Sequence, residues 1–405
     1  MGLASLALAL RLALVLAAGH TRLGFGDPIF YHAAGMSLSN GDGYEFFGHP
    51  TVHWPPGYPF ALAAVYRVFG ASVTHGLVLN AVVGALTVPL VYVTALRVFG
   101  RPSAVVAAAA LAVFPGQILV TDLLLSESLY TFGLAAFVAL AATLQPRPRS
   151  YLALGVVAGL TALTRQEALF FPLVVLLMGW GRGIRLDAVR RAALVAAAML
   201  AVVVPWTVRN AVTVHAFVPV ATNAGTTLWS GHNPIANGGP VYATQTNILR
   251  RIHRGGSFEV KESALLRQKA ISYAVHHPGR ELELIPLKLR SLLRGDSHLV
   301  DAINSAEQHP LGRRAAVWLR RAADAAFYAL LAAMLATIVL LRRTLWRIPV
   351  IRGVLAYMAL ALPLYGFVYY GNYRYRLPLE PLMLLVTAPG AVALWGGWAS
   401  RGSPR

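Results

Sequence analysis

Long apolar runs separated by short polar stretches dominate this chain of 405 residues. Runs of roughly 16 to 24 apolar residues are long enough to form tilted membrane-spanning helices. On this basis we expect about ten such helices. They lie near residues 3–20, 74–98, 103–120, 124–144, 151–164, 167–181, 192–206, 324–341, 351–370 and 377–397. The pattern therefore predicts an all-α polytopic membrane protein.

Short basic loops set the expected orientation. Cytoplasmic loops carry an excess of Lys and Arg, and several short connections are basic, the first of them weakly. These connections are residues 99–103, 145–150, 181–191 and 342–347. With an even number of helices, both termini lie in the cytoplasm, and the segments 21–73 and 207–323 lie outside. A segment as long as 207–323 escapes the charge rule, so its arginines do not contradict this orientation.

The two outer segments differ in character. Residues 21–73 are rich in Gly, Pro, His and aromatic residues, and their part 56–70 is apolar but short, so we expect an interfacial helix there. Residues 207–323 combine turn-forming stretches with two amphipathic helical runs, 262–279 and 280–295, which predict a small outer domain. The expected divisions of the chain are residues 1–206, 207–323 and 324–405.

Composition supports a membrane protein and excludes several other classes. Hydrophobic residues make up 57% of the chain, charged residues make up 13%, and the mean hydropathy of +0.59 is rare among soluble proteins. The formal net charge is +19, but the basic residues are scattered between apolar runs, so we expect anionic lipid as a partner and no nucleic acid. The chain has no cysteine, which excludes disulfides and thiolate metal sites.

Acidic side chains are few, and some stand at predicted outer ends of helices. Among the 16 acids of the chain, those at or near outer helix ends are Asp27, Asp122, Glu127, Glu167 and Glu380. An ionisable group at membrane depth is costly and is therefore a candidate for a functional site. The alternative is a structural ion pair with Arg165, Arg374 or Arg376.

Arginines occupy the same predicted outer ends. They are Arg165, Arg209, Arg374 and Arg376. The planar guanidinium suits phosphate, and several converging guanidiniums would hold a phosphodiester. The alternative is that these side chains extend to lipid headgroups. For Arg165 we favour phosphate, because it interrupts an otherwise apolar hairpin two residues from Glu167.

Other catalytic motifs are missing from the sequence. His49 and His53 have the spacing of metal ligands, but Pro50 stands between them and no third ligand matches, so we expect no metal site. There is no GxxxxGK[ST] phosphate-binding loop and no GxSxG nucleophile motif. We expect no cofactor, although a divalent cation remains an alternative.

An ordered set of motifs resembles the GT-C superfamily of membrane glycosyltransferases. The matching stretches are "GDPIFYHAAGMSL", "HPTVHWPPGYPFALAAVYRVFG", "LSESLYTFGLAAFVAL", "LTRQEALFFPL", "PWTVRNAVTVHAFVPVATNAGTTLWSGHNP" and "YRYRLPLEPLMLL". The resemblance covers almost the whole chain in order, and it is strongest to the bacterial branch related to protein O-mannosyltransferases and lipid A aminoarabinose transferases. It implies a GT-C fold in the cytoplasmic membrane, with the active site facing the periplasmic or extracellular side.

The resemblance implies transfer of a sugar, with inversion, from a polyprenyl-phosphate carrier to an acceptor at the outer face. The family's catalytic base stands at the exit of its first helix, and that position is Asp27 here. Glu127 falls where relatives carry a second acidic residue that orients the acceptor or supports the site. For the donor phosphate we expect Arg165 first and Arg376 second, together with Arg374.

The resemblance also marks residues that we expect to contact substrate. Relatives often carry a basic residue before the Pro-Pro pair, whereas this chain has Trp54 there, preceded by His53, so Trp54 is a candidate for stacking on a sugar. Tyr31, Tyr58 and Glu167 complete the expected substrate-binding set. The branch generally uses no divalent cation.

A transporter or flippase of an anionic lipid-linked saccharide is the alternative function. The same arginines would then line a passage, but transporters tend to have internal repeats and broken helices at mid-membrane. No repeat is visible in the sequence, and the polar residues cluster at one predicted face, which favours the enzyme. The acceptor is left open as a glycan, a lipid or a protein.

Overall fold

The computed structural model describes residues 2–18, 23, 26–180, 186–241, 258–306 and 311–401. Its regular elements up to residue 178 are α1 (Gly2–Ala18), α2 (Asp27–Asn40), β1 (Glu45–Phe46), β2 (His49–Pro50), α3 (Gly57–Phe69), α4 (Val73–Phe99), α5 (Arg101–Val113), α6 (Pro115–Leu119), η1 (Val120–Asp122), α7 (Glu127–Thr143), α8 (Pro148–Thr164), η2 (Gln166–Phe170) and α9 (Phe171–Met178). The later ones are α10 (Leu186–Val214), α11 (Ala224–Gly231), α13 (Phe258–His276), α14 (Pro278–Leu292), α15 (Ser297–Ala306), α16 (Arg313–Arg347), α17 (Pro349–Pro363), η3 (Leu364–Val368), α18 (Tyr373–Arg376), η4 (Leu377–Leu379) and α19 (Glu380–Arg401).

Several helices are long and apolar enough to cross a membrane, as the sequence predicts. Among the described residues there are 5 such helices, or up to 6 if a bent pair counts as one span. The single helices are Val73–Phe99, Leu186–Val214, Arg313–Arg347, Pro349–Val368 and Tyr373–Trp395. Shorter apolar helices are Gly2–Ala18, Glu127–Thr143 and Gln166–Met178. The all-α membrane fold is confirmed, and the number of ten spans stays a prediction.

The helix expected at 103–120 is broken. It ends at Val113, and Pro115 begins α6, so that α5 and the segment Pro115–Asp122 meet at 51°. Phe114 between them is extended, with φ −67° and ψ 118°. Proline restricts the preceding residue to extended backbone and has no N–H for a helical hydrogen bond, which explains the break.

Two other helices run further than the apolar pattern predicts. α10 continues to Val214, beyond the expected end at 206, and α16 begins at Arg313, well before 324. The apolar run ends where polar residues begin, but the helix continues because those residues find partners. Asn210, for example, is buried and donates to the carbonyls of Val218 and Val220 at 3.1 Å each.

The first outer segment folds over the ends of the membrane helices. As expected, its apolar part forms a helix, α3, which packs against α2. A Cβ at Gly57, the first residue of α3, would lie 2.6 Å from Oγ1 of Thr164 at the end of α8. Glycine therefore permits the backbone of α3 to touch α8, and this close approach fixes the first outer loop above the turn that follows α8.

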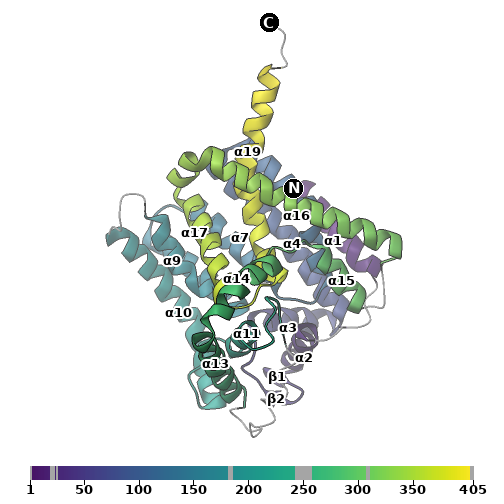
Figure 1. Ribbon diagram of the computed structural model, residues 1–405, viewed down its shortest axis with the longest axis vertical. Coiled ribbons are helices and arrows are strands. Elements are labelled where there is room, and N and C mark those ends of the chain that lie inside the picture. The colour runs from purple at the N-terminus through teal and green to yellow at the C-terminus, as the bar shows by residue number, and fades with distance from the viewer. Residues whose placement is uncertain are drawn as a thin grey trace.

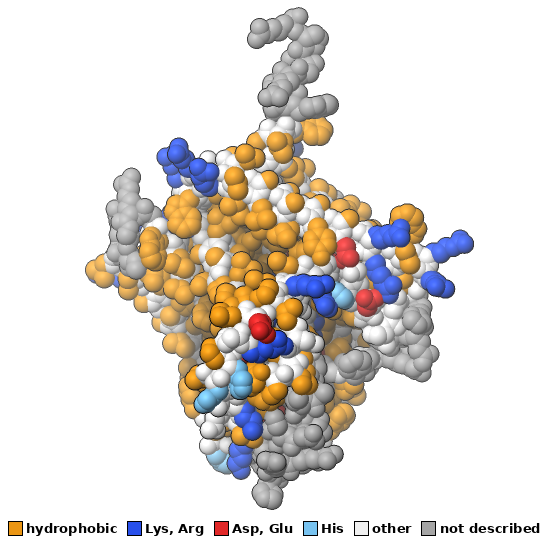
Figure 2. All heavy atoms as spheres, viewed as in Figure 1, with side chains coloured by type: hydrophobic (Ala, Val, Ile, Leu, Met, Phe, Trp, Pro, Cys, Tyr) orange, Lys and Arg blue, Asp and Glu red, His pale blue; other side chains and the backbone are white. Residues whose placement is uncertain are grey.

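The first outer segment and part of the second lie at one end of the molecule, whereas α14 and α15 of the second lie near its middle (Figure 1). In Figure 1, the elements α2, α3, α11, α13 and the β1–β2 hairpin lie at the lower end, whereas α19 runs toward the upper end. Hydrophobic side chains cover much of the middle of the visible face, and most of the Lys and Arg side chains seen there stand toward its margins (Figure 2). This distribution fits a protein whose middle faces lipid. The division into three units predicted from the sequence stays a prediction.

Candidate active site

A cavity of about 1020 Å³ lies between the first outer loop, the ends of membrane helices and the second outer segment. Its wall comes from the start of α2, the loop before α3, the turn between α8 and η2, α11, the start of α13 and the stretch from η3 to α18. These elements are far apart in the sequence. A cavity of this size is large enough for a small ligand or the head of a larger one.

Asp27 enters this cavity as the first residue of α2. The preceding Gly26 has φ +86°, in the left-handed region that favours glycine, and Pro28 follows within the first helical turn. The side chain is 32% exposed. Its Oδ2 pairs with Nη2 of Arg374 at 2.9 Å, and its Oδ1 accepts a hydrogen bond from Nε1 of Trp54 at 3.3 Å.

Arg374 joins Asp27 to Glu127. It lies in α18, where the side chain of Asn372 accepts a hydrogen bond from the backbone N–H of Arg374 at 3.0 Å and so caps the short helix. Its Nε donates to Oε1 of Glu127 at 2.8 Å while Nη2 holds Asp27. One guanidinium thus spans two carboxylates that belong to different helices.

Arg165 is the second cationic group of the cavity. It follows the last residue of α8 in an extended conformation, with φ −150°. Its Nη1 lies 3.3 Å from Oε1 of Glu127, and its Nη2 lies 3.0 Å from Oε1 of Glu167. The Tyr365 hydroxyl donates to the same Glu167 oxygen at 2.7 Å, and the Tyr375 ring lies 5.6 Å from the Arg165 guanidinium carbon.

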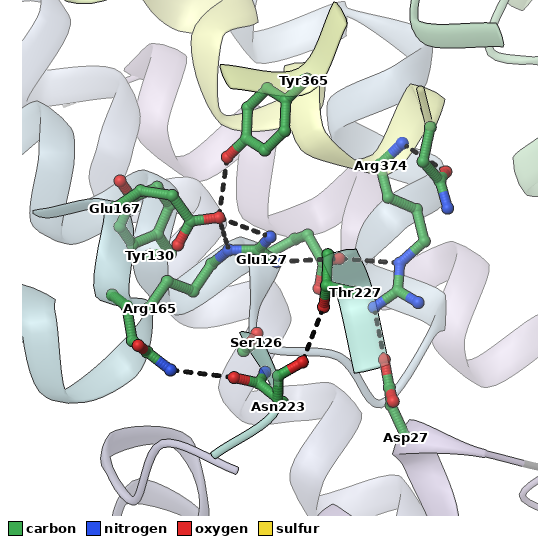
Figure 3. A network of polar contacts seen from close by, with 12 residues as sticks. Asp27, Ser126, Glu127, Tyr130, Arg165, Glu167, Asn223, Thr227, Tyr365 and Arg374 are labelled. Carbon is green, nitrogen blue, oxygen red and sulfur yellow. Dashed lines mark hydrogen bonds and ion pairs between the residues drawn. The ribbon is translucent and has the colours of Figure 1, made fainter. Parts of the chain in front are cut away.

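Glu127 is the buried centre of this network, between the two arginines (Figure 3). Its side chain is 1% exposed, and it does not contribute to the cavity wall. Oε1 accepts a hydrogen bond from Arg374 and forms an ion pair with Arg165, while Oε2 has no hydrogen-bond partner among the described residues. Glu127 is therefore placed to hold the two guanidiniums beside each other, and direct contact with an acceptor does not fit its burial.

The two guanidiniums of the network are open to the cavity. Three carboxylates share two guanidiniums, and both guanidiniums face the cavity. A phosphate group that entered the cavity would find planar forks of N–H donors, with which it can form charge-assisted hydrogen bonds. It would compete for them with Asp27 and Glu167, the two carboxylates of the network that also line the cavity.

Tyr31, His53 and Trp54 of the first outer loop also line the cavity, and their contact with substrate stays a prediction. The Tyr31 hydroxyl donates to Oγ of Ser126 at 3.4 Å. Burial lowers the pKa of His53 to about 4, against the weaker opposing effect of the Asp27 charge, so the imidazole is neutral at pH 7. His53 can therefore offer a neutral hydrogen-bonding group to a substrate but no counter-charge to a phosphate.

Tyr58 does not reach the cavity. Its side chain is fully buried, and its hydroxyl donates to Oδ1 of Asn80 at 3.0 Å. Tyr58 is the second residue of α3, and its buried ring packs edge to face against Tyr31. The expected substrate contact of Tyr58 is therefore wrong, and it supports the cavity wall from behind.

Arg376 also lies away from the cavity, contrary to its expected role in phosphate binding. Its guanidinium is 4% exposed and pairs with Asp296 at 2.7 Å and with Glu380. It donates in addition to the carbonyls of Leu292 and Arg294. These contacts occupy the guanidinium of Arg376 and match the structural ion pair that was the alternative for the outer acids. Glu380 belongs to this buried cluster and not to the cavity.

Several cavity residues had no signal in the sequence. Glu259 and Glu262 at the start of α13 form part of the wall. Glu259 accepts hydrogen bonds from the Thr51 hydroxyl and the Val52 backbone N–H, both at 2.6 Å, and so ties α13 to the first outer loop. Burial raises the pKa of Glu259, and it raises that of Glu262 to about 6. The sequence predicts α13 only as an amphipathic helix, and it does not show which segment of the chain this helix packs against.

Arg209 has a local role in place of the lipid contact considered for it. It donates to the backbone carbonyls of Thr51 at 2.7 Å and Tyr44 at 3.0 Å. Its guanidinium carbon also lies 4.9 Å from the centre of the Trp206 ring. Arg209 thus fastens the first outer loop to α10, beside the cavity.

Comparisons with known proteins agree with this architecture. Residues 53–209 match the family model described as dolichyl-phosphate-mannose-protein mannosyltransferase. The oligosaccharyltransferase of Archaeoglobus fulgidus, in complex with Zn and sulfate, has 14% identity and a TM-score of 0.55, over 98% of this chain and 50% of its own. AglB of the same organism, in complex with an inhibitory peptide and a dolichol-phosphate, has 13% identity and a TM-score of 0.51, over 98% and 52%.

A third solved structure is ArnT from Cupriavidus metallidurans bound to undecaprenyl phosphate, with 16% identity and a TM-score of 0.48, over 98% of this chain and 79% of its own. No curated protein sequence matches the chain. The chain spans about half the length of the archaeal oligosaccharyltransferase structures that it matches. The family-model match and the archaeal structures confirm the resemblance to the GT-C superfamily and its fold.

Proposed function

We propose that the chain is an inverting glycosyltransferase that moves a sugar from a polyprenyl-phosphate carrier to an acceptor at the outer face of the cytoplasmic membrane. The observation that carries this proposal is the convergence of Asp27, Arg165 and Arg374 on one cavity. A carboxylate that can take a proton and two cations that can hold a phosphate are the groups that this transfer needs.

Asp27 is the proposed general base. As the acceptor oxygen bonds to C1 of the sugar, its hydroxyl proton passes to the Asp27 carboxylate. The bond between C1 and the phosphate oxygen breaks, its electron pair stays on that oxygen, and the polyprenyl phosphate leaves. Attack from the side opposite the phosphate inverts the configuration at C1. Asp27 is suited to this step because its side chain is 32% exposed and lines the cavity at the start of α2.

Arg165 and Arg374 are the proposed phosphate ligands. The leaving phosphate gains negative charge in the transition state, and fixed cations in a partly water-excluded site stabilise that charge without reorganising. Glu127 holds both guanidiniums from behind. Arg376, which the sequence also suggested, is not proposed for this role because it is buried in another ion pair.

The nature of the donor rests on the relatives. AglB is described in complex with a dolichol-phosphate, and the matching family model is that of a dolichyl-phosphate-mannose-dependent enzyme. A polyprenyl-phosphate sugar is therefore the donor class that we favour. The acceptor stays open between a glycan, a lipid and a protein. The alternative of a flippase for the same carrier is less well supported, because the charged network lies at one end of the helices and not along a passage.

Independence from metal is a further expectation. Among the described residues, no group of three or more His, Asp and Glu side chains is arranged to hold a metal ion. Transfer in the presence of a chelator should therefore equal transfer without it, and a restored rate on adding Mg²⁺ or Mn²⁺ to a chelated, inactive enzyme would contradict this.

The experiment that tests the function uses the purified protein in nanodiscs with radiolabelled polyprenyl-phosphate sugars and a membrane extract as the source of acceptor. Wild type and Asp27→Asn are compared for loss of sugar from the carrier. We expect consumption of one donor by wild type alone. Movement of intact donor between the leaflets of proteoliposomes, with no consumption, would instead identify a flippase.

A further inference from the structure

Each carboxylate oxygen of Asp27 accepts a hydrogen bond from a different side chain. Arg374 holds Oδ2 at 2.9 Å, and the indole N–H of Trp54 donates to Oδ1 at 3.3 Å. The two donors differ in what else they can bind. Arg374 is charged and faces a cavity that we propose for a phosphate, whereas the indole has a single N–H and no charge.

The bond from Arg374 is the one that a donor phosphate would disturb. The same guanidinium also pairs with Glu127, so it is shared between two carboxylates before any anion arrives. A phosphate bound to Arg374 competes for the N–H that now reaches Asp27. Asp27 is the more exposed of the two carboxylates, at 32% against 1%, and is therefore the partner that Arg374 can release at the lower cost.

Trp54, in contrast, is fixed on several sides. Its ring stacks on Phe30, with centroids 3.9 Å apart and planes at 21°, and it meets the edge of His53 with centroids 4.1 Å apart. The carbonyl of Trp54 accepts a hydrogen bond from the Tyr44 hydroxyl at 2.9 Å, and Pro55 follows. The stack on Phe30 also occupies a ring face that stacking on a sugar would need.

We propose that Trp54 is a positioning residue, whose indole N–H keeps the Asp27 carboxylate aimed at the acceptor when Arg374 turns from Asp27 to the donor phosphate. This inference rests on the proposed function, since it assigns Trp54 a part in the same transfer. Trp54, which stands before the Pro-Pro pair, thus acts through Asp27 in this chain and does not contact phosphate. A misplaced base slows the chemical step far more than it weakens donor binding.

A pair of substitutions separates the hydrogen bond from the stacking. Trp54→Phe keeps an aromatic ring against Phe30 and removes the N–H. Trp54→His keeps an N–H, because Nε2 of an imidazole can occupy the ring position of the indole Nε1. Wild type and Asp27→Asn are measured first, and transfer that depends on Asp27 establishes the proposed function before the Trp54 variants are compared.

We expect kcat to fall roughly 10-fold in Trp54→Phe and to recover at least partly in Trp54→His, with the KM for the donor within about twofold of wild type in both. Binding of polyprenyl phosphate to each variant reports on folding, and Trp54→Met serves as a second variant without an N–H if the phenylalanine protein does not fold. A kcat for Trp54→Phe equal to or above that of Trp54→His would overturn the proposal. So would a loss confined to the KM for the donor.

Discussion

Arg374 and Arg376 are two positions apart in α18 and reach different partners. Residues at i and i+2 point to different sides of a helix, so Arg374 faces the cavity and Arg376 faces the buried carboxylates Asp296 and Glu380. The sequence marks both as arginines at an outer helix end. It cannot tell which one faces the cavity, because that depends on how the short helix is rotated against its neighbours.

Arg165 tests the proposed phosphate site at the residue scale. Arg165→Ala removes a guanidinium that faces the cavity, and we expect polyprenyl-phosphate binding to weaken roughly 10- to 100-fold, as when one partner of a buried charged pair is lost. Titration with labelled carrier in nanodiscs measures this. Arg67→Ala, at an exposed arginine of α3 outside the cavity, should bind like wild type. Equal affinity in Arg165→Ala and wild type would remove Arg165 from the site.

Arg376 should show the opposite behaviour. Arg376→Met leaves Asp296 and Glu380 buried without their cation, which costs about 3–5 kcal/mol when a buried ion pair is broken. We expect a clearly lower thermal unfolding midpoint in detergent, while the protein that remains folded at 4 °C binds carrier with unchanged affinity. Weakened carrier binding at full stability would restore the phosphate role to Arg376.

At the scale of elements, α13 matters because it closes the cavity against the first outer loop. The contact depends on Glu259, whose carboxylate accepts from Thr51 and Val52. The amphipathic pattern of residues 262–279 predicts the helix, but α13 begins earlier, at Phe258, so both cavity carboxylates lie in its first turns. The amphipathic pattern of a single helix shows which of its faces is apolar. It does not show which other element that face packs against.

The pH dependence of stability follows from Glu262 in this helix. Burial, helped by the Glu259 charge, raises its pKa from 4.5 to about 6, so ionisation is disfavoured in the folded state. Stability is then lost as the pH rises from 4.5 through 6, and the loss is complete above that range. Glu262→Gln removes this loss.

We therefore expect Glu262→Gln to be more stable than wild type by about 1 kcal/mol at pH 7.5, a value reduced for solvent screening, and no more stable at pH 4. Thermal unfolding midpoints at the two pH values measure the difference. Glu283→Gln, at a carboxylate of α14 that is 67% exposed, serves as the matched control. A gain for Glu262→Gln that was the same at both pH values would contradict the assignment.

At the scale of the whole molecule, a formal net charge of +19 is spread over an apolar body. Length and hydropathy predict the membrane class and most of the helices, because transfer of apolar runs into lipid makes the largest contribution to the free energy of a membrane protein. The bend at Pro115 and the polar ends of α10 and α16 depend on local backbone limits and partners, which the apolar pattern does not contain. The cavity, formed by segments far apart in the chain, depends on their packing.

The basic loops should make stability depend on lipid charge. Arg147, Arg149, Arg342 and Arg343 are exposed at the predicted cytoplasmic side, and anionic headgroups attract such residues by about 1 kcal/mol each. We expect a higher unfolding midpoint in nanodiscs with anionic lipid than in zwitterionic ones, and a smaller difference after Arg147→Gln with Arg149→Gln or at high salt. An identical midpoint in both lipids would refute this partner.

The most direct test of Asp27 as the general base is a single-turnover measurement of sugar transfer. Wild type and Asp27→Asn in nanodiscs are loaded with the labelled donor that wild type consumes, acceptor is added, and the release of sugar from the carrier is followed in time. We expect Asp27→Asn to bind the donor as tightly as wild type within about threefold and to transfer at least roughly 100-fold more slowly. Transfer by Asp27→Asn at a rate near that of wild type would show that Asp27 is not the base.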